Sequence, residues 1–244
     1  SSDAHGRRLE AALAGDGVSL SLVQRTDLPT TQALAELDER GEARYRFLVD
    51  GTSAPRLDGD QLLRNLPGDI AAVHVGTLGL VFEPMAAALE ALVASLARDT
   101  IVMVDPNCRP SAITNADAYT ARLRRILERA DVVKASVADI DYLGFAPPSR
   151  VLVITDGPRP VRVRHDGVAS SVDAPAAEVV DTVGAGDTFG GALLASLVHD
   201  GVDRAGLGDA TAVLQAVRFA ARASALVCER EGADPPTLAE LGGW

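Results

Sequence analysis

Residues 178–197, which read EVVDTVGAGDTFGGALLASL, constrain the fold of this chain more than any other stretch. Val179 and Val180 end an apolar, extended approach, residues 184–186 form a turn with almost no side-chain bulk, and residues 192–197 run helically. An extended segment, a glycine turn and a helix in this order direct backbone N–H groups and the positive end of a helix dipole at one point. The stretch therefore predicts an anion site that suits a phosphate group.

Asp187 stands in the first turn of that helix, beside the predicted anion site. A carboxylate at this place can accept a proton, and phosphoryl transfer to an alcohol needs an acceptor for the hydroxyl proton. A purely structural role is the alternative, because Asp is favoured near helix starts and Gly-Ala-Gly can be no more than a tight turn.

The segment DTVGAGDTFGGALL, residues 181–194, resembles the second signature of the PfkB (ribokinase-like) carbohydrate kinases. The resemblance implies that Gly184, Ala185 and Gly186 form an anion hole for the γ-phosphoryl group of ATP. It implies that Asp187 is the general base that deprotonates a sugar hydroxyl, with Mg²⁺ bridging the β- and γ-phosphates. In some relatives a monovalent cation such as K⁺ binds near the position of Asp181, so K⁺ is a further candidate.

The resemblance also implies a fold: an α/β, ribokinase-like three-layer sandwich with a mostly parallel central sheet, helices on both faces and a small β-lid. We expect residues 1–26 and 51–244 to form the main domain and residues 27–50 to form the lid. Helical and apolar extended segments alternate from residue 55 onward, as a parallel sheet requires. The expected strands are 18–25, 71–75, 101–105, 131–135, 151–155, and a hairpin of 161–165 and 168–174 with His165 pointing outward; the expected helices are 4–14, 60–66, 83–98, 117–129 and 209–227.

Two short runs, residues 30–37 and 44–50, are joined by a glycine-containing turn and predict a hairpin. They resemble the family lid, which closes over the sugar, and the resemblance makes Thr31 and Arg46 candidate sugar contacts. An ordinary edge hairpin is the alternative. The family's first strand and its Gly-Gly-x-x-x-Asn segment, which contact the sugar, have no counterpart in this sequence.

Polar residues follow the expected strand 101–105 in the stretch DPNCRP. In parallel sheets ligands collect at the carboxyl ends of the strands. The stretch resembles the DxNxR segment of fructokinase-like members, which makes Asn107 and Arg109 candidate substrate ligands, while Asp105 is a candidate for orienting its neighbours. The alternative is a proline-fixed turn with a solvated Arg.

Lys134, Ser136 and Asp139 follow the next expected strand. Ser136 and Asp139 have the spacing of a capping box, which is one interpretation. The corresponding family motif organises Mg²⁺ and its waters, so the resemblance also makes Asp139 a candidate metal contact through water, Ser136 a candidate ligand on the cofactor side, and Lys134 a candidate phosphate contact.

The remaining candidates concern the nucleotide. Thr155 and Gly157 resemble a nucleotide-contacting T-x-G that follows a strand, and the long Ala-rich helix with its closing loop resembles the adenine side of the family site. Ala225, Cys228 and Gly232 are therefore candidate cofactor neighbours, with plain core packing as the alternative.

Composition limits the partners. A net charge of −11 and a pI near 4.8 argue against nucleic-acid and membrane surfaces, because both need a basic footprint. Cys108 and Cys228 show neither CxxC nor metal-ligand spacing, and no apolar run approaches the length of a bilayer span. We expect a cytoplasmic protein that binds a small sugar and ATP, with a homodimer through the lid as a candidate assembly.

Several other functions compete with this one. GAGDTFGG gives no GxGxxG in register and GxxxxGK[ST] is absent, which argues against NAD-binding Rossmann enzymes and P-loop NTPases. A non-catalytic sugar or nucleotide sensor on the same fold stays open. Within the kinases, the DxNxR segment and the lid pattern favour a ketohexose or a 2-keto-3-deoxysugar acid over ribose or a nucleoside.

Overall fold

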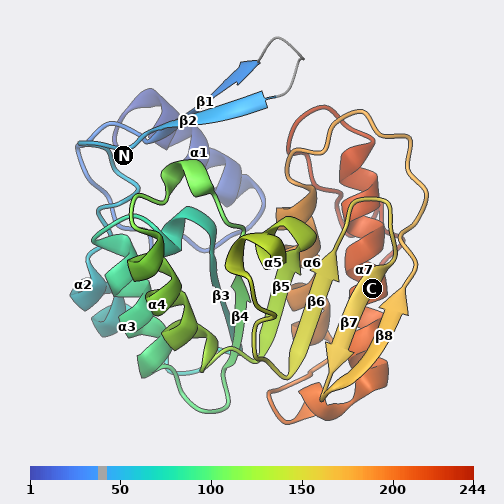
Figure 1. Cartoon of the computed structure of the whole chain (residues 1–244). Coiled ribbons are helices and arrows are strands. Elements are labelled where there is room, and N and C mark those ends of the chain that lie inside the picture. The colour runs from blue at the N-terminus through green and yellow to red at the C-terminus, as the bar shows by residue number, and fades with distance from the viewer. Residues whose placement is uncertain (38–42) are drawn as a thin grey trace. The chain divides into compact units, whose positions relative to one another are not determined.

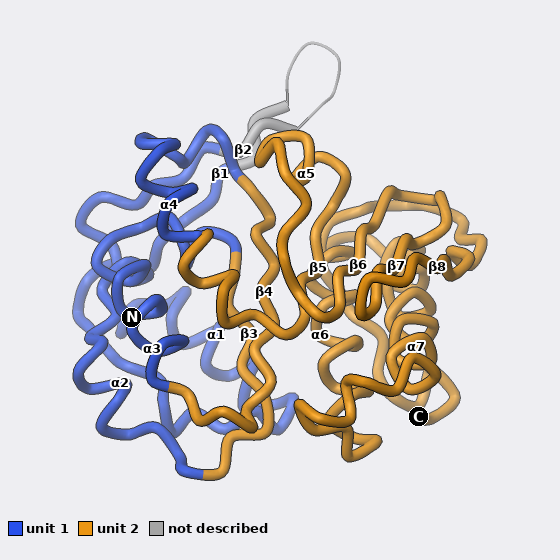
Figure 2. Tube along the Cα trace, turned by 60° about the horizontal axis from the view of Figure 1, so that its bottom comes forward, with its two compact units in different colours: residues 1–68, 77–95, 109–123 blue, residues 69–76, 96–108, 124–244 orange. Residues whose placement is uncertain are grey.

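The computed structural model describes residues 1–37 and 43–244, which divide into two compact units. Figure 2 shows unit 1 in blue, with residues 1–68, 77–95 and 109–123, and unit 2 in orange, with residues 69–76, 96–108 and 124–244. The hairpin belongs to unit 1, and the expected lid boundary at residues 27–50 stays a prediction. The turn expected at residues 38–41 falls within residues 38–42, which lie outside the described part of the chain.

Unit 1 is built from short elements. The antiparallel pair β1 and β2 confirms the expected hairpin, since residue 32 pairs with residue 48. Asp3 caps the first helix with its carboxylate, which accepts hydrogen bonds from the backbone N–H groups of Gly6 and Thr30, and these hydrogen bonds lower the pKa of Asp3. The elements are α1 (Ala4–Gly15), β1 (Gln32–Leu37), β2 (Ala43–Leu48), α2 (Gly59–Asn65), η1 (Thr77–Leu80), α3 (Met85–Ser95) and η2 (Pro110–Ala112), and α4 (Ala116–Leu127) begins here and ends in unit 2.

The strand expected at residues 18–25 is wrong. This segment follows α1 as turns and irregular chain, and Val18, Leu22 and Val23 are exposed. An apolar run becomes a strand only where it finds a pairing partner and a face to bury. Within the described residues, no strand pairs with this segment.

Unit 2 contains one sheet of six strands in the order β3-β4-β5-β6-β7-β8 (Figure 1). The first four strands are parallel, and β7 and β8 add an antiparallel hairpin at one edge. Because the parallel strands share a direction, their carboxyl ends meet at one edge of the sheet. The bounds are β3 (Ala72–Gly76), β4 (Ile101–Asp105), β5 (Val132–Ser136), β6 (Val151–Thr155), β7 (Val161–His165) and β8 (Val168–Val172), with helices α5 (Val137–Leu143), α6 (Ala185–His199), η3 (Gly206–Gly208) and α7 (Ala210–Cys228).

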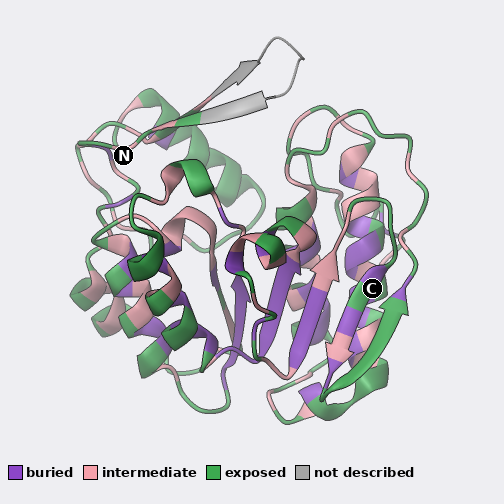
Figure 3. Ribbon diagram, in the orientation of Figure 1, coloured by how far each residue is buried: buried purple, intermediate pink, exposed green. Residues whose placement is uncertain are grey.

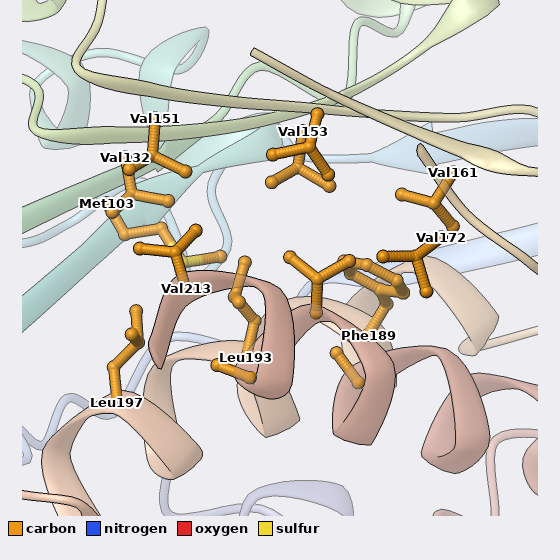
Figure 4. Packing of buried hydrophobic residues seen from close by; sticks show 14 of the residues in the cluster. Met103, Val132, Val151, Val153, Val161, Val172, Phe189, Leu193, Leu197 and Val213 are labelled. Carbon is orange, nitrogen blue, oxygen red and sulfur yellow. The ribbon is translucent and has the colours of Figure 1, made fainter. Parts of the chain in front are cut away.

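One face of this sheet packs against α6 and α7. Strand β4 is buried along its whole length, which its continuous apolar run predicts for a central strand (Figure 3). Phe189 and Leu193 of α6 are almost fully buried, and each such side chain contributes about 1.5–3 kcal/mol by burial. Gly190 lets α6 approach the sheet, because a Cβ atom there would lie 3.2 Å from Cε of Met103. Figure 4 shows the two layers, with Met103, Val132, Val151, Val153, Val161 and Val172 on the strands and Phe189, Leu193, Leu197 and Val213 on the helices.

Two expectations about unit 2 need correction. His165 is not turned outward: it is 8% exposed, and its Nε2 lies 2.7 Å from the carbonyl oxygen of Leu207. Side chains alternate along a strand, so His165 shares the inner face with Val161 and Val163. Helix α7, with 19 residues and a mean hydropathy of 1.2, does reach the length and apolarity of a bilayer span. The core helix of a folded domain meets the same criteria. The residues of α7 that pack into the core of unit 2 are Val213, Ala216, Val217, Ala220 and Ala221.

Candidate functional site

The glycine turn and the start of α6 have the predicted geometry. Gly184 is the N-cap residue with φ of 79°, and α6 begins at Ala185, which places Asp187 in its first turn. Within this turn the Ala185 N–H donates to the carbonyl oxygen of Thr182 at 3.2 Å. The amides of Gly186 and Asp187 belong to the first turn, whose N–H groups have no intrahelical acceptors. An anion at this helix start would therefore find mainly these two donors and the helix dipole.

Residues that follow α7 hold the turn in place. A Cβ atom on Gly184 would lie 2.9 Å from Cβ of Ala233, so both the contact and the positive φ require glycine. Asp181 accepts hydrogen bonds from the N–H groups of Val183 at 3.0 Å and Gly232 at 2.9 Å. These two hydrogen bonds lower the pKa of Asp181, so its carboxylate is charged near neutral pH. The turn is thus shaped by residues some 50 positions further along the chain.

A pocket of about 630 Å³, which we call the large pocket, opens beside this turn. Its volume lies within the usual range of small-molecule sites, about 300–1,000 Å³. It brings together six of the residues that the sequence singled out, namely Thr155, Gly157, Ala185, Gly186, Ala225 and Cys228. Burial raises the pKa of the Cys228 thiol, and the nearby Asp181 and Glu229 add to this effect, so Cys228 serves as a wall of the pocket and not as a nucleophile.

Asp187 faces a different cavity. It is exposed and, with Gly184 and Thr188, lines a second pocket of about 490 Å³, which we call the side pocket. Ala185 and Gly186 line the large pocket, so the turn forms a wall shared by both. The carboxylate is therefore accessible, as a group that exchanges protons with a ligand must be.

A buried ion pair lies directly against the turn. Nζ of Lys134, on β5, donates to Oδ2 of Asp105, at the end of β4, at 2.8 Å, and both side chains are at most 4% exposed. A Cβ atom on Gly186 would lie 2.9 Å from this Nζ. The predicted phosphate contact Lys134 therefore sits under the turn, and the sequence left its pairing with Asp105 unrecognised.

His74 on β3 is a further group that the sequence analysis missed. Desolvation lowers its pKa, the charge of Asp105 opposes that change, and Lys134 and Asp187 also act on the ring. Its Cε1 would lie 3.8 Å from a Cβ atom on Gly190. The available signal was its place two residues before Gly76, at the carboxyl end of a parallel strand.

Ser136 and Asp139 form the capping box at the start of α5. Oδ2 of Asp139 accepts from the N–H and the hydroxyl of Ser136, at 2.7 and 2.6 Å, while Oδ1 accepts from the N–H of Cys108 at 2.6 Å. Three of about four acceptor positions are thus taken by the protein. Asp139 fixes the loop after β4, and its predicted metal contact through water stays a prediction.

The other predicted ligands are divided between the two units. Asn107 adopts a left-handed backbone with φ of 38° in the loop that Asp139 holds. Thr31, Arg46 and Arg109 belong to unit 1. The hydroxyl of Thr31 lies 2.6 Å from that of Thr52 and accepts from the N–H of Ala54 at 2.9 Å, so it already holds the base of the hairpin. Their contacts with a sugar remain predictions.

No cage for a metal ion is present in the described part of the chain, since no three His, Cys, Asp or Glu side chains there are grouped to hold one. Mg²⁺ often binds through nucleotide phosphates and water with only one or two carboxylates. The described residues therefore do not form a site that would hold a metal ion through protein ligands alone.

Comparisons with known proteins agree on one family. The model of the pfkB family carbohydrate kinases matches residues 2–240. A fructokinase from Rhizobium leguminosarum bv. trifolii is 32% identical over 210 residues, which cover 81% of this chain and 64% of the relative. Fructokinase-1 of Zea mays is 27% identical over 256 aligned residues, which cover 98% of this chain and 78% of the relative. The chain thus spans slightly less than two thirds of the first relative.

Solved structures share the fold. A fructokinase with bound ATP from Xylella fastidiosa has a TM-score of 0.90 at 26% identity, over 98% of this chain and 81% of that chain. An aminoimidazole riboside kinase from Salmonella enterica has a TM-score of 0.83 at 21% identity, over 99% of this chain and 82% of that chain. These likenesses confirm the ribokinase-like α/β fold, and the family model confirms the resemblance seen in residues 181–194. The chain belongs to the pfkB family of carbohydrate kinases.

Proposed function

We propose that this protein is an ATP-dependent sugar kinase that transfers the γ-phosphoryl group of ATP to a sugar hydroxyl. The observation that carries the proposal is the Gly184–Asp187 turn, of which Ala185 and Gly186 line the large pocket while Asp187 is exposed and lines the side pocket. Asp187 takes the hydroxyl proton as the sugar oxygen attacks phosphorus, and the amides of Gly186 and Asp187 stabilise the charge on the phosphoryl oxygens.

The nucleotide occupies the large pocket in this proposal. Its walls are mostly small and apolar, as a purine ring requires, and Thr155, Gly157, Ala225 and Cys228 lie on them. Mg²⁺, when bound with the nucleotide, neutralises charge on the β- and γ-phosphates. Asp139, with three hydrogen bonds from the protein, contributes by orienting the Asn107 loop.

A fructose-like ketosugar is the proposed acceptor. The relatives with 27–32% identity are named fructokinases, and the Asp105–Arg109 stretch resembles their DxNxR segment. Asn107, Arg109, Thr31 and Arg46 are the proposed sugar contacts, and the β1–β2 hairpin is the proposed lid. Sedimentation velocity with and without this hairpin tests the homodimer that the resemblance implies.

The decisive test measures ADP release with MgATP and a panel of fructose, ribose, 2-keto-3-deoxygluconate, tagatose 6-phosphate and adenosine. Asp187→Asn should lower kcat by about 10²- to 10⁴-fold and leave ATP affinity nearly unchanged, because only proton transfer is lost. Asp200→Asn, at the other end of the same helix, is the matched control and should keep wild-type activity. Full activity in Asp187→Asn would remove Asp187 from the role of base.

The same panel separates the alternatives. Absence of turnover with every sugar, together with tight sugar or nucleotide binding, would favour a non-catalytic sensor. Preference for ribose or adenosine would move the protein to the ribose or nucleoside branch. Replacing KCl by tetramethylammonium chloride in the assay tests the dependence on K⁺.

A further inference from the structure

Lys134 is the only lysine in the chain. The sequence contains 23 Lys and Arg residues, of which 22 are Arg. Arg is always charged and presents a broad, planar fork, whereas the ammonium of Lys is a compact charge with three rotatable donors that can lose its proton when buried. The single lysine ammonium of this sequence thus lies against the backbone of the Gly184–Asp187 turn.

The Lys134–Asp105 pair is only half satisfied. Oδ1 of Asp105 is buried and accepts no hydrogen bond, and within residues 1–37 and 43–244 Nζ of Lys134 donates to Asp105 alone. An ammonium has three donors, so two of them remain unused. Buried polar groups are nearly always hydrogen-bonded, and unused ones in a native structure call for a ligand, water or ion as partner.

The position of the unused donors points to their partner. Nζ lies so close to Gly186 that a Cβ atom there would be 2.9 Å away, and Gly186 also lines the large pocket. A phosphoryl group bound by the Gly186 and Asp187 amides would be near a positive charge in a weakly screening environment. A charge in such an environment interacts more strongly than one in water.

We propose that Asp105 is a positioning residue that holds Lys134 as a charged donor beneath the turn, where it assists a bound phosphoryl group. Asp105 itself touches neither substrate in this arrangement and acts through Lys134. The inference rests on the proposed function for the identity of the anion. The electrostatic dependence of Lys134 on Asp105 does not require that function.

Besides Lys134, the charges that act on Asp105 are His74 on β3 and Asp139 on α5, while Asp187 on α6 acts on His74. Burial raises the pKa of Asp105, and Lys134 opposes that rise. A buried ammonium without a carboxylate is destabilised relative to its neutral form. Asp105→Asn keeps the shape and a hydrogen-bond acceptor but removes the counter-charge, so Lys134 should lose its proton at lower pH.

The single lysine makes this directly measurable. With ¹³Cε-labelled lysine the protein gives one lysine signal, which is followed by NMR from pH 6 to 10. In Asp105→Asn the midpoint of this titration should move to lower pH than in the wild type, whereas in Asp200→Asn it should not move. A non-hydrolysable ATP analogue, whose binding is confirmed by calorimetry, should shift the wild-type signal. The proposal would be overturned if the titration midpoint of Lys134 were the same in Asp105→Asn as in the wild type. It would also be overturned if the wild-type lysine signal did not shift when the analogue binds.

Kinetics give the second readout. In Asp105→Asn we expect kcat/KM for ATP to fall about 10-fold at pH 7 and to fall further as pH rises to 9, while the wild type keeps a flatter basic limb. Lys134→Met should be weakly active at all pH values, and adding Asp105→Asn to it should cause no further loss, because the second residue acts only through the first. Multiplied losses in the double variant would contradict the proposal.

The two readouts keep the questions apart. If no sugar is phosphorylated but the NMR titration and the analogue shift behave as stated, the proposed function fails and the positioning role stands. If the wild type is an active kinase and Asp105→Asn shows no new pH dependence, the positioning role fails alone. If Asp105→Asn folds poorly, the double variant can still be measured, because replacing both partners removes the buried uncompensated charge.

Discussion

Strands β4 and β5 of unit 2 carry a buried carboxylate at each end, and the two are bonded differently. At the amino end, Asp131 has both oxygens occupied: Arg204 donates to Oδ1 at 2.6 Å, and Arg129 and the N–H of Val102 donate to Oδ2 at 2.9 Å each. At the carboxyl end, Asp105 has one oxygen bound by Lys134 and one that finds no hydrogen-bond partner among residues 1–37 and 43–244. The carboxylate at the amino end has all its oxygens hydrogen-bonded and stabilises the fold. The carboxylate with an unused oxygen lies at the carboxyl end, where ligands of parallel sheets bind.

The cations differ as well. The Arg partners of Asp131 reach solvent, with side chains 21% and 43% exposed, and also bind backbone carbonyls such as that of Thr100. Lys134 is buried and bonded to Asp105 alone among the described residues. Arg keeps its charge in either surrounding, whereas a buried Lys depends on a nearby carboxylate to stay charged.

The largest expected effect is on stability at the carboxyl end. Asp105→Asn should lower the free energy of unfolding by about 3 kcal/mol at pH 7, because it leaves a buried ammonium without a counter-charge. Part of this loss should return by pH 9–10, where the ammonium can shed its proton. Urea unfolding at both pH values measures it, and a loss that does not change with pH would contradict the comparison.

Gly186→Ala tests the contact between the turn and the ion pair. Its Cβ atom would displace the buried Nζ of Lys134, so kcat/KM should fall about 10- to 100-fold, the value of one hydrogen bond to a charged group. Gly15→Ala, in helix α1, also meets nothing within 4 Å and is the control. Steady-state kinetics measure kcat/KM for both variants. Equal values would show that the contact between Lys134 and the turn does not affect activity.

A smaller effect is expected at the amino end. Asp131→Asn should cost about 1–2 kcal/mol of unfolding free energy, less than a fully buried pair, because both Arg side chains reach water. This loss should be the same at pH 7 and pH 9, and kinase activity should not change. Reduced activity in a well-folded Asp131→Asn protein would show that the two ends are coupled.

His74 should give the smallest effect, a pH dependence of stability. Desolvation lowers its pKa below 6.5, so below pH 6.5 the unfolded chain binds more protons than the folded one. Stability should therefore be complete above pH 6.5 and decline as pH falls from there through the lower, folded-state pKa. Thermal unfolding at pH 7.5 and 5.5 should show a reduced decline in His74→Gln, while the same change at His5, on helix α1, should leave the decline as it is.

Much of the fold follows from local pattern. Strands β4 and β6 have the bounds expected from residues 101–105 and 151–155, because continuous apolar runs specify buried parallel strands. The turn before α6 could be located because glycine content and helix start coincide there. The outward orientation expected for His165 is wrong, although its spacing from Val161 and Val163 places it on the same, buried face of β7. Residues 18–25 show that an apolar run without a pairing partner does not become a strand.

The site was predicted in its local parts only. Lys134 and Asp105 lie 29 positions apart, and they meet because β4 and β5 are neighbours in the sheet. Strand order depends on pairing across the whole unit, so a single sequence does not reveal it. For the same reason the sequence does not reveal the hydrogen bond from the N–H of Cys108 to Asp139, which spans 31 positions, and the metal contact of Asp139 stays a prediction.

The contact between Gly184 and Ala233 bears on how the protein is made. Asp181 accepts the Gly232 N–H and Gly184 packs against Ala233, and the ribosome adds these two partners after the sheet of unit 2, whose last strand ends at Val172. The nascent polypeptide can thus arrange its strands early, while the glycine turn before α6 gains its partners later. Translation that stops shortly before residue 232 would yield a chain with most of its core but without the residues that hold this turn.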